Sequence, residues 1–151
     1  MMNYEVVEIE EKKVAGLKIR TTNEDMKCLG DMSELWQKFF GENLQGVINN
    51  PLGKCSYGVY YNYESDLTKP YDYMAGLEVC EANSDFDNTI IPGGSYARFT
   101  AKGNVQQVVG ELWQSIWTSG LDRSYVCDFE SYRNDSKGMD KQTVDIYISL
   151  K

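Results

Sequence analysis

The chain repeats one order of elements, and this internal repeat restricts its fold more than any other feature. Leu35-Trp36-Gln37 in the first half recurs as Leu112-Trp113-Gln114 in the second, each within an amphipathic stretch. Each stretch follows a strand-like segment and precedes two more, so the order strand–helix–strand–strand occurs twice. We therefore expect a single domain over residues 1–151, with repeated units at about 1–82 and 89–151.

The spacing of apolar residues predicts two helices, one in each unit. From Met26 to Phe40 the apolar side chains recur every three to four positions, and Gly41 follows as a helix stop. From Val105 to Trp117 the same spacing recurs, and Gly120 follows. Both stretches therefore present one apolar face that must pack against the rest of the domain.

Extended segments rich in β-branched and aromatic residues predict the strands. These segments are Val6–Ile9, Lys13–Arg20, Cys55–Tyr63, Tyr71–Cys80, Tyr96–Gly103, Tyr125–Tyr132 and Thr143–Leu150. The intervening stretches 45–54, 66–70, 81–88 and 134–141 are polar or contain Gly and Pro, and we expect loops and turns there. One unit of roughly 75 residues is too small to bury a stable core alone, so the two units should share one.

Composition excludes several classes of function. The 151 residues contain no histidine, which excludes His-based catalytic triads and His-ligated metals. The net charge of −8 argues against nucleic acid or an anionic membrane as a direct partner, because both are polyanions. No apolar run approaches the roughly 20 residues of a membrane span, and the N-terminus does not resemble a signal peptide.

The cysteines indicate a reducing compartment rather than a metal or disulfide framework. Cys28, Cys55, Cys80 and Cys127 lie far apart, and no CxxC motif occurs. We expect four free thiols that behave as small apolar side chains in a cytoplasmic protein. No metal, cofactor or catalytic residue is expected from these patterns.

A lone acid among aromatic residues is the first candidate for a binding site. Alternation in the strand Tyr125–Tyr132 places Glu130 and Tyr132 on one face. In the last strand, one face is apolar, and alternation places Tyr147 on the other face. If the two strands are antiparallel neighbours, Glu130, Tyr132 and Tyr147 can share a face. Tyrosine rings and a carboxylate together suit a cationic ligand. The alternative is a solvated Glu130 on a strand covered by tyrosines.

Other aromatic and acidic residues leave two roles open. Glu78 is an acid within the otherwise apolar strand segment Gly76–Val79, where it faces either solvent or a binding groove. The tryptophans on the helical stripes either pack in the core or form the wall of a ligand site. In Cys55–Tyr63, alternation separates Tyr57, Tyr61 and Tyr63 from Tyr60 and does not show which set lines a groove. The expected ligand-binding residues are Glu130, Tyr147, Tyr132, Glu78, Trp113, Trp117, Tyr96 and Trp36.

Several short motifs, taken in order, resemble the GyrI-like small-molecule-binding domain, which is also the effector domain of AraC-type and MerR-type multidrug regulators. The motifs are Tyr4–Gly16, Leu35-Trp36-Gln37, Ile91–Ala97, Leu112-Trp113, Asp128–Tyr132 and Val144–Ile148. The resemblance implies an α+β fold of two pseudo-symmetric strand–helix–strand–strand units. These units form curved antiparallel sheets, with two long helices flanking a central groove.

The resemblance also implies a function. Members of the family bind flat, hydrophobic and often cationic compounds with aromatic residues and one acid, whose position falls here on Glu130, and the aromatic of the last strand falls on Tyr147. The multidrug regulators carry a helix-turn-helix domain, which this sequence lacks, so we expect a stand-alone binding module that senses or sequesters hydrophobic, cationic small molecules.

Two other functions stay open at this stage. The first is a hydrolase for electrophilic small molecules, in which Glu130 or Glu78 acts as general base. The second is a protein-interaction module, for example one that inhibits or protects a topoisomerase. The binding module is favoured because the sequence offers aromatics and lone acids but no nucleophile–base pair.

Overall fold

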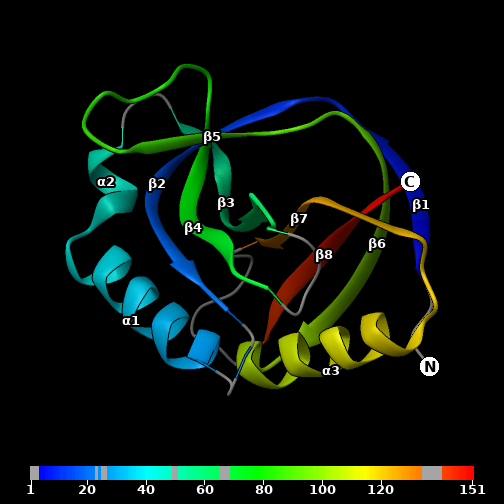
Figure 1. Cartoon of the computed structure of the whole chain (residues 1–151). Helices are drawn as coiled ribbons and strands as arrows, with labels where there is room; N and C mark the ends of the chain where they lie inside the picture. Colours follow the sequence, from blue (N-terminus) through cyan, green and yellow to red (C-terminus); the bar gives the residue numbers. More distant parts are fainter. Residues whose placement is uncertain (1–3, 23, 25–26, 49–50, 65–68, 134–140) are drawn as a thin grey trace.

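The computed structural model describes residues 4–22, 24, 27–48, 51–64, 69–133 and 141–151. Figure 1 shows a strongly curved sheet with helices α1 and α3 along one side of it. The elements are β1 (Glu5–Ile9), β2 (Lys12–Thr21), α1 (Lys27–Gly41), α2 (Leu44–Val47), β3 (Pro51–Tyr61), β4 (Tyr71–Val79), β5 (Asp87–Ile91), β6 (Gly94–Gly103), α3 (Val105–Thr118), β7 (Arg123–Tyr132) and β8 (Gln142–Leu150).

The order of the strands expresses the internal repeat. Within the described residues, one eight-stranded sheet has the order β1-β6-β8-β7-β3-β4-β2-β5, and every pair is antiparallel. Exchanging β1–β4 for β5–β8 reverses this order and leaves it otherwise unchanged. The pseudo-two-fold axis therefore passes between β3 and β7, and the first strand of each half pairs with the second strand of the other half.

The helices pack on the same face of the sheet through the apolar stripes that the sequence shows. Leu35 and Phe39 of α1 are buried against β2 and β4, and Leu112 and Ile116 of α3 are buried against β6 and β8. Each such side chain contributes roughly 1.5–3 kcal/mol when fully buried. Asn104 caps α3 by accepting a hydrogen bond from the backbone N–H of Gln107.

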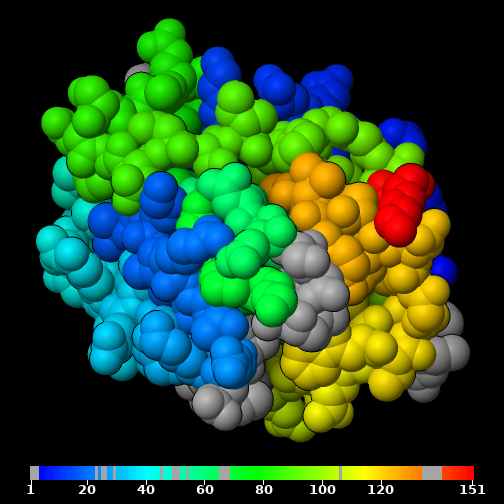
Figure 2. Space-filling model, viewed as in Figure 1, coloured from blue at the N-terminus to red at the C-terminus, as the bar shows by residue number. Residues whose placement is uncertain are grey.

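The other face of the sheet encloses a second apolar cluster because the sheet curls on itself. Ile9 on the edge strand β1 and Ile91 on the opposite edge strand β5 both pack in this cluster, together with Phe129 of the central strand β7. Strands at the two ends of a flat eight-stranded sheet could not share one cluster. In the view of Figure 2, side chains fill the spaces between the ribbons of Figure 1.

The α+β class, the two repeated units and both long helices agree with the expectation from sequence. Three segments expected to be connections differ. Leu44–Val47 forms the short helix α2, residues 51–54 already belong to β3, and Asp87–Ile91 forms the edge strand β5. An edge strand that lies beside a single neighbour keeps many polar residues, so β5 lacks a clear alternating pattern. Residues 66–68 and 134–140 of the expected turns at 66–70 and 134–141 lie outside the described residues.

We expect Gly16→Ala to lower the free energy of unfolding by about 1–3 kcal/mol through overpacking. Gly16 pairs with Gly76 across β2 and β4, and a Cβ on Gly16 would overlap the backbone carbonyl of Ala75. Urea unfolding followed by circular dichroism measures the change. The matched control is Gly110→Ala in α3, where a Cβ meets no atom within 4 Å and alanine should stabilise the helix by about 0.5–1 kcal/mol. Equal stability of the two variants would contradict this account.

Candidate functional site

The central strands of the sheet lie between the two long helices. Helix α1 packs over β2 and β4, and helix α3 packs over β6 and β8. Strands β3 and β7 occupy the middle of the strand order. Side chains that project from β3 and β7 toward the helices therefore meet residues of both α1 and α3.

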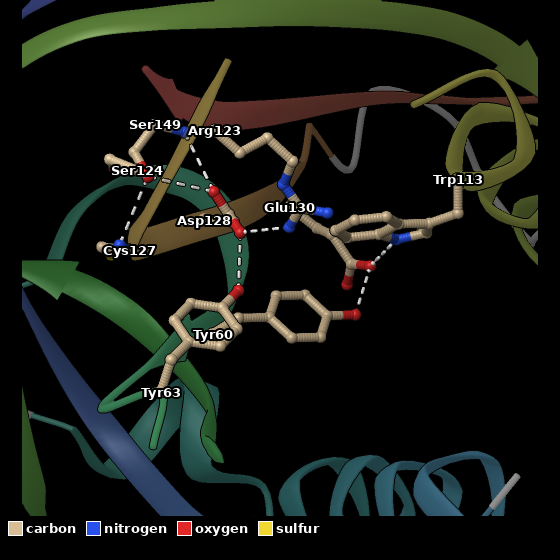
Figure 3. Close-up of polar contacts among 9 residues, drawn as sticks. All are labelled: Tyr60, Tyr63, Trp113, Arg123, Ser124, Cys127, Asp128, Glu130 and Ser149. Carbon is tan, nitrogen blue, oxygen red and sulfur yellow. Dashed lines mark hydrogen bonds and ion pairs between the residues drawn. The ribbon is translucent and has the colours of Figure 1, made fainter. Parts of the chain in front are cut away.

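Glu130 of β7 projects into this space and is the centre of a hydrogen-bonded cluster. Its side chain is only 2% exposed. Four neutral groups donate to its carboxylate: Tyr60 Oη (2.8 Å) and Trp113 Nε1 (2.8 Å) to Oε2, and Tyr132 Oη (2.7 Å) and Tyr73 Oη (3.3 Å) to Oε1. Figure 3 shows the two donors to Oε2, Tyr60 from below and Trp113 from the side of α3. We call this group the Glu130 cluster.

Both halves of the repeat contribute to the Glu130 cluster. Trp113 of α3 donates to the carboxylate directly. Its counterpart Trp36 of α1 donates to Tyr73 Oη (2.8 Å), and its ring lies edge-on to Tyr132 at 5.6 Å. The repeated Leu-Trp-Gln motif thus places one indole on each side of the acid.

A glycine leaves the space that the carboxylate occupies. Gly58 of β3 is paired directly with Glu130 across the central strands. A Cβ at Gly58 would overlap the hydroxyl of Tyr73 and lie 2.8 Å from Glu130 Oε1. The absence of a side chain at Gly58 therefore allows Glu130 and Tyr73 to meet on this face.

Burial governs the ionisation of the cluster. Removal from water raises the pKa of Glu130 above its ordinary value, although the four hydrogen bonds act in the opposite direction. Burial, followed by the charge of Glu130, raises the pKa of Tyr60, Tyr73 and Tyr132 well above that of free tyrosine. The tyrosines therefore stay neutral and keep their protons for donation.

A second buried acid lies two residues away on the same strand and has a cationic partner. Asp128 is fully buried and forms an ion pair with Arg123 Nη2 at 2.7 Å. It also accepts hydrogen bonds from Tyr63 Oη (2.6 Å) and from the backbone N–H of Ser149 (2.9 Å). Figure 3 shows these partners around Asp128. In contrast, Glu130 forms no ion pair with any described residue.

The guanidinium of Arg123 also contacts aromatic rings. It lies 4.5 Å from the ring centroid of Tyr125 and 5.9 Å from that of Trp113. Tyr125 has a left-handed backbone (φ 53°) where the register between β7 and β8 shifts. This bulge turns the strand so that Arg123 reaches back to Asp128. The delocalised cation of Arg123 therefore already lies near the ring of Trp113.

Exposed rings extend the cluster to the surface along both helices. Phe40 stacks on Trp36 at 5.6 Å, and Trp117 lies 6.1 Å from Trp113. Phe40 and Trp117 are 54% and 56% exposed, whereas Trp36 and Trp113 are half-buried. Each helix thus carries a pair of rings, four residues apart, that leads from solvent toward Glu130.

The structure brings part of the predicted residue set together. Glu130, Tyr132 and Trp113 belong to the Glu130 cluster, Trp36 contacts its members Tyr73 and Tyr132, and Trp117 lies beside Trp113 at the surface. The remaining predicted residues lie on the opposite face of the sheet. Tyr147 stacks on Phe129 with ring centroids 4.4 Å apart, Tyr96 donates to the carbonyl of Pro92, and Glu78 contacts Lys12 and Tyr57.

The expectation that Tyr147 shares a face with Glu130 is wrong. Both strands alternate as expected, and β7 and β8 are antiparallel neighbours. However, Phe129 pairs with Tyr147, and Glu130 pairs with Ile146. Residues directly opposite each other share a face, so a shift of one residue in register inverts the whole set.

The expected residue set left out Tyr60, Tyr73 and Gly58 of the site, and sequence reasoning placed Tyr63 on the wrong face. Tyr73 lies in a strand where alternation alone gave no reason to choose it, and Gly58 has no side chain to attract notice. Tyr63 was grouped with Tyr57 and Tyr61, but it packs on the face of Tyr60. Asn62 has a left-handed backbone (φ 51°) that breaks the alternation just before Tyr63. An asparagine directly after a run of strand residues is the signal that could have revealed this turn.

The described residues include no group of three or more Cys, Asp or Glu side chains placed to hold a metal ion. No helix among them combines the length and apolar character that a membrane span requires. The arrangement is instead one buried carboxylate with neutral donors, enclosed by aromatic rings that reach the surface.

A curved antiparallel sheet with two helices on one face is the architecture of an effector-binding domain. Residues 5–150 match the Cass2 family, described as integron-associated effector binding protein, and the chain belongs to this family. The match confirms the GyrI-like resemblance that the sequence motifs indicated.

Three relatives illustrate the similarity. The crystal structure of the integron cassette protein VCH_CASS2, from the mobile metagenome of Vibrio cholerae, is 31% identical with a TM-score of 0.80, covering 99% of this chain and 96% of that one. SAV2435, solved with bound tetraphenylphosphonium, is 19% identical with a TM-score of 0.78, covering 99% and 94%. A Bacillus subtilis (strain 168) protein named as a candidate transcriptional regulator, YobU, is 26% identical over 97% of this chain and 96% of its own length.

We expect Asp128→Asn to lower the free energy of unfolding by about 3–5 kcal/mol, because the substitution leaves the Arg123 charge buried without its partner. Urea unfolding measures this loss. The control is Asp122→Asn, which removes an exposed ion pair with Lys151 (3.7 Å) and should change stability by about 0.5 kcal/mol or less. A similar small effect for both variants would show that the buried pair is not needed for stability.

The raised pKa of Glu130 predicts a pH-dependent stability. At pH values above 4.5, the ordinary pKa of the Glu130 side chain, Glu130 is deprotonated in the unfolded state but still protonated in the folded state. The free energy of unfolding therefore falls as the pH rises through the pKa of the folded state. Glu130→Gln removes this titration. The stability of the variant minus that of wild type should therefore increase from about pH 4.5 upward, measured by urea unfolding at several pH values. A difference that does not vary with pH would contradict the shift.

Proposed function

We propose that the chain binds hydrophobic cations at the Glu130 cluster, as a module that senses or sequesters such compounds. One observation carries the proposal: the two buried acids of β7 differ in their partners. Asp128 is neutralised by Arg123, whereas the described partners of Glu130 are all neutral donors. The negative charge of Glu130 is thus available to an external cation, and the surrounding rings offer aromatic contact to the same ligand.

The exposure of the aromatic rings indicates the path by which a ligand reaches Glu130. Glu130 and Tyr73 are buried, and among the described residues the half-buried Trp36, Trp113 and Tyr132 lie between them and solvent, so a ligand reaches the charge by contacting or displacing such rings. These rings lie next to the exposed Phe40 and Trp117. A flat or multi-ring cation can therefore exchange water for aromatic contact along either helix. The tetraphenylphosphonium bound to SAV2435 has this chemistry and supports the choice of ligand class.

Hydrolysis in the same site is less well supported. A general base needs a free lone pair facing the substrate or its attacking water. Here each oxygen of Glu130 already accepts two hydrogen bonds. The geometry therefore favours an electrostatic role for the carboxylate over proton abstraction.

We expect tetraphenylphosphonium to quench the tryptophan fluorescence of the protein in a saturable manner, because Trp36 and Trp113 border the site. Glu130→Gln should weaken binding by about 1–3 kcal/mol, as expected when a buried charged contact is lost. Glu78→Gln is the matched control, since Glu78 lies on the opposite face of the sheet. The titration is repeated with a neutral compound of the same shape, tetraphenylmethane made soluble with a neutral glycol chain.

Two outcomes would contradict the proposal. Equal affinity of wild type and Glu130→Gln for the cation would remove Glu130 from the site. A loss of affinity in Glu78→Gln instead would move the cation to the other face of the sheet, where Tyr147 and Tyr96 lie.

A further inference from the structure

The Glu130 carboxylate offers a ligand its charge but no vacant acceptor position. A carboxylate has about four lone-pair sites. Four side chains from four elements occupy them: Tyr60 and Trp113 on Oε2, and Tyr132 and Tyr73 on Oε1. The side chain is 2% exposed, so water has almost no access to the oxygens either.

The neighbouring hydroxyl groups are poor substitutes as acceptors. The hydroxyl oxygen of Tyr73 already accepts a hydrogen bond from Trp36 Nε1 at 2.8 Å. The hydroxyls of Tyr60 and Tyr132 are neutral oxygens whose protons point at Glu130. A ligand N–H that leaves water for this site therefore loses strong hydrogen bonds and regains, at most, bonds to neutral acceptors.

We infer that the Glu130 cluster selects cations that carry no N–H donor, such as quaternary ammonium and phosphonium ions, over protonated amines of the same shape. This inference rests on the proposed function of the cluster. A cation without donors loses no hydrogen bond on entry, and it gains the field of Glu130 and contact with the rings. A protonated amine gains the same attraction but leaves its N–H groups without a charged acceptor.

The tyrosine donors would then set specificity as well as hold the acid in place. Tyr132 is the half-buried member of the set, and its hydroxyl lies 2.7 Å from Glu130 Oε1. Tyr132→Phe removes this donor and opens one lone pair toward the side that a ligand approaches. A protonated amine could then donate directly to the carboxylate, so the preference should shrink.

The test compares two cations that differ in one substituent, benzhydryltrimethylammonium and protonated benzhydryldimethylamine, by calorimetric titration near neutral pH. Wild type is expected to bind the quaternary ion about tenfold or more tightly than the protonated amine. In Tyr132→Phe the ratio should fall several-fold, chiefly through tighter binding of the amine. Because the same pair of ligands is compared across variants, the extra methyl group cancels from the change in ratio.

Two further variants keep the experiment interpretable. Tyr96→Phe removes a buried hydroxyl on the opposite face, where it donates to Pro92, and should leave the ratio unchanged. Tyr60→Phe opens a lone pair on Oε2 and replaces Tyr132→Phe if circular dichroism shows that the latter does not fold.

The outcomes separate this inference from the proposed function. Saturable binding of both cations with equal affinity, or tighter binding of the amine by wild type, would overturn the selectivity and leave the cation site standing. An unchanged ratio in both Tyr132→Phe and Tyr60→Phe would also overturn it. Binding of neither cation would overturn the proposed function and the selectivity together.

Discussion

The burial of Glu130 with no cationic partner among the described residues is the constraint on which the site depends. Moving a charged group out of water costs several kcal/mol, and the described groups that offset this cost are neutral hydrogen-bond donors. These donors come from β3, β4, β7 and α3, with Trp36 of α1 supporting one of them. The acid is therefore satisfied only when both halves of the fold are assembled around the central strands.

The pseudo-two-fold axis explains why the two sides of the site are alike although its central residues differ. Duplication gives each half a helix with a tryptophan at the same place, so Trp36 and Trp113 approach the central strands from opposite sides. The axis passes between β3 and β7, where Gly58 and Glu130 face each other. A symmetric pair of acids at this point would repel strongly in a buried environment. One acid opposite one glycine gives a single charge with room for its donors.

Local sequence patterns predicted much of the fold but only part of the candidate site. The 3–4 residue spacing located both helices, and alternation correctly separated Glu130 from Phe129. However, alternation within one strand does not determine the register between two strands. The observed register pairs Tyr147 with Phe129 rather than with Glu130. A single left-handed residue, Asn62, likewise moved Tyr63 to the other face. The edge strand β5 was missed because its exposed residues are polar, so tertiary pairing with β2 rather than local pattern determines it.

The contrast between Asp128 and Glu130 links stability to binding. Arg123 is held beside Asp128 by a backbone bulge and lies near the ring of Trp113, so the fold already stabilises one cation in this region. Glu130, two residues further along β7, has only neutral hydrogen-bond donors among its described partners. Such a site lowers stability until a partner of opposite charge binds. Burial raises the pKa of Glu130, and under the proposed function a cation that binds only the folded state would raise the stability of the domain as it binds.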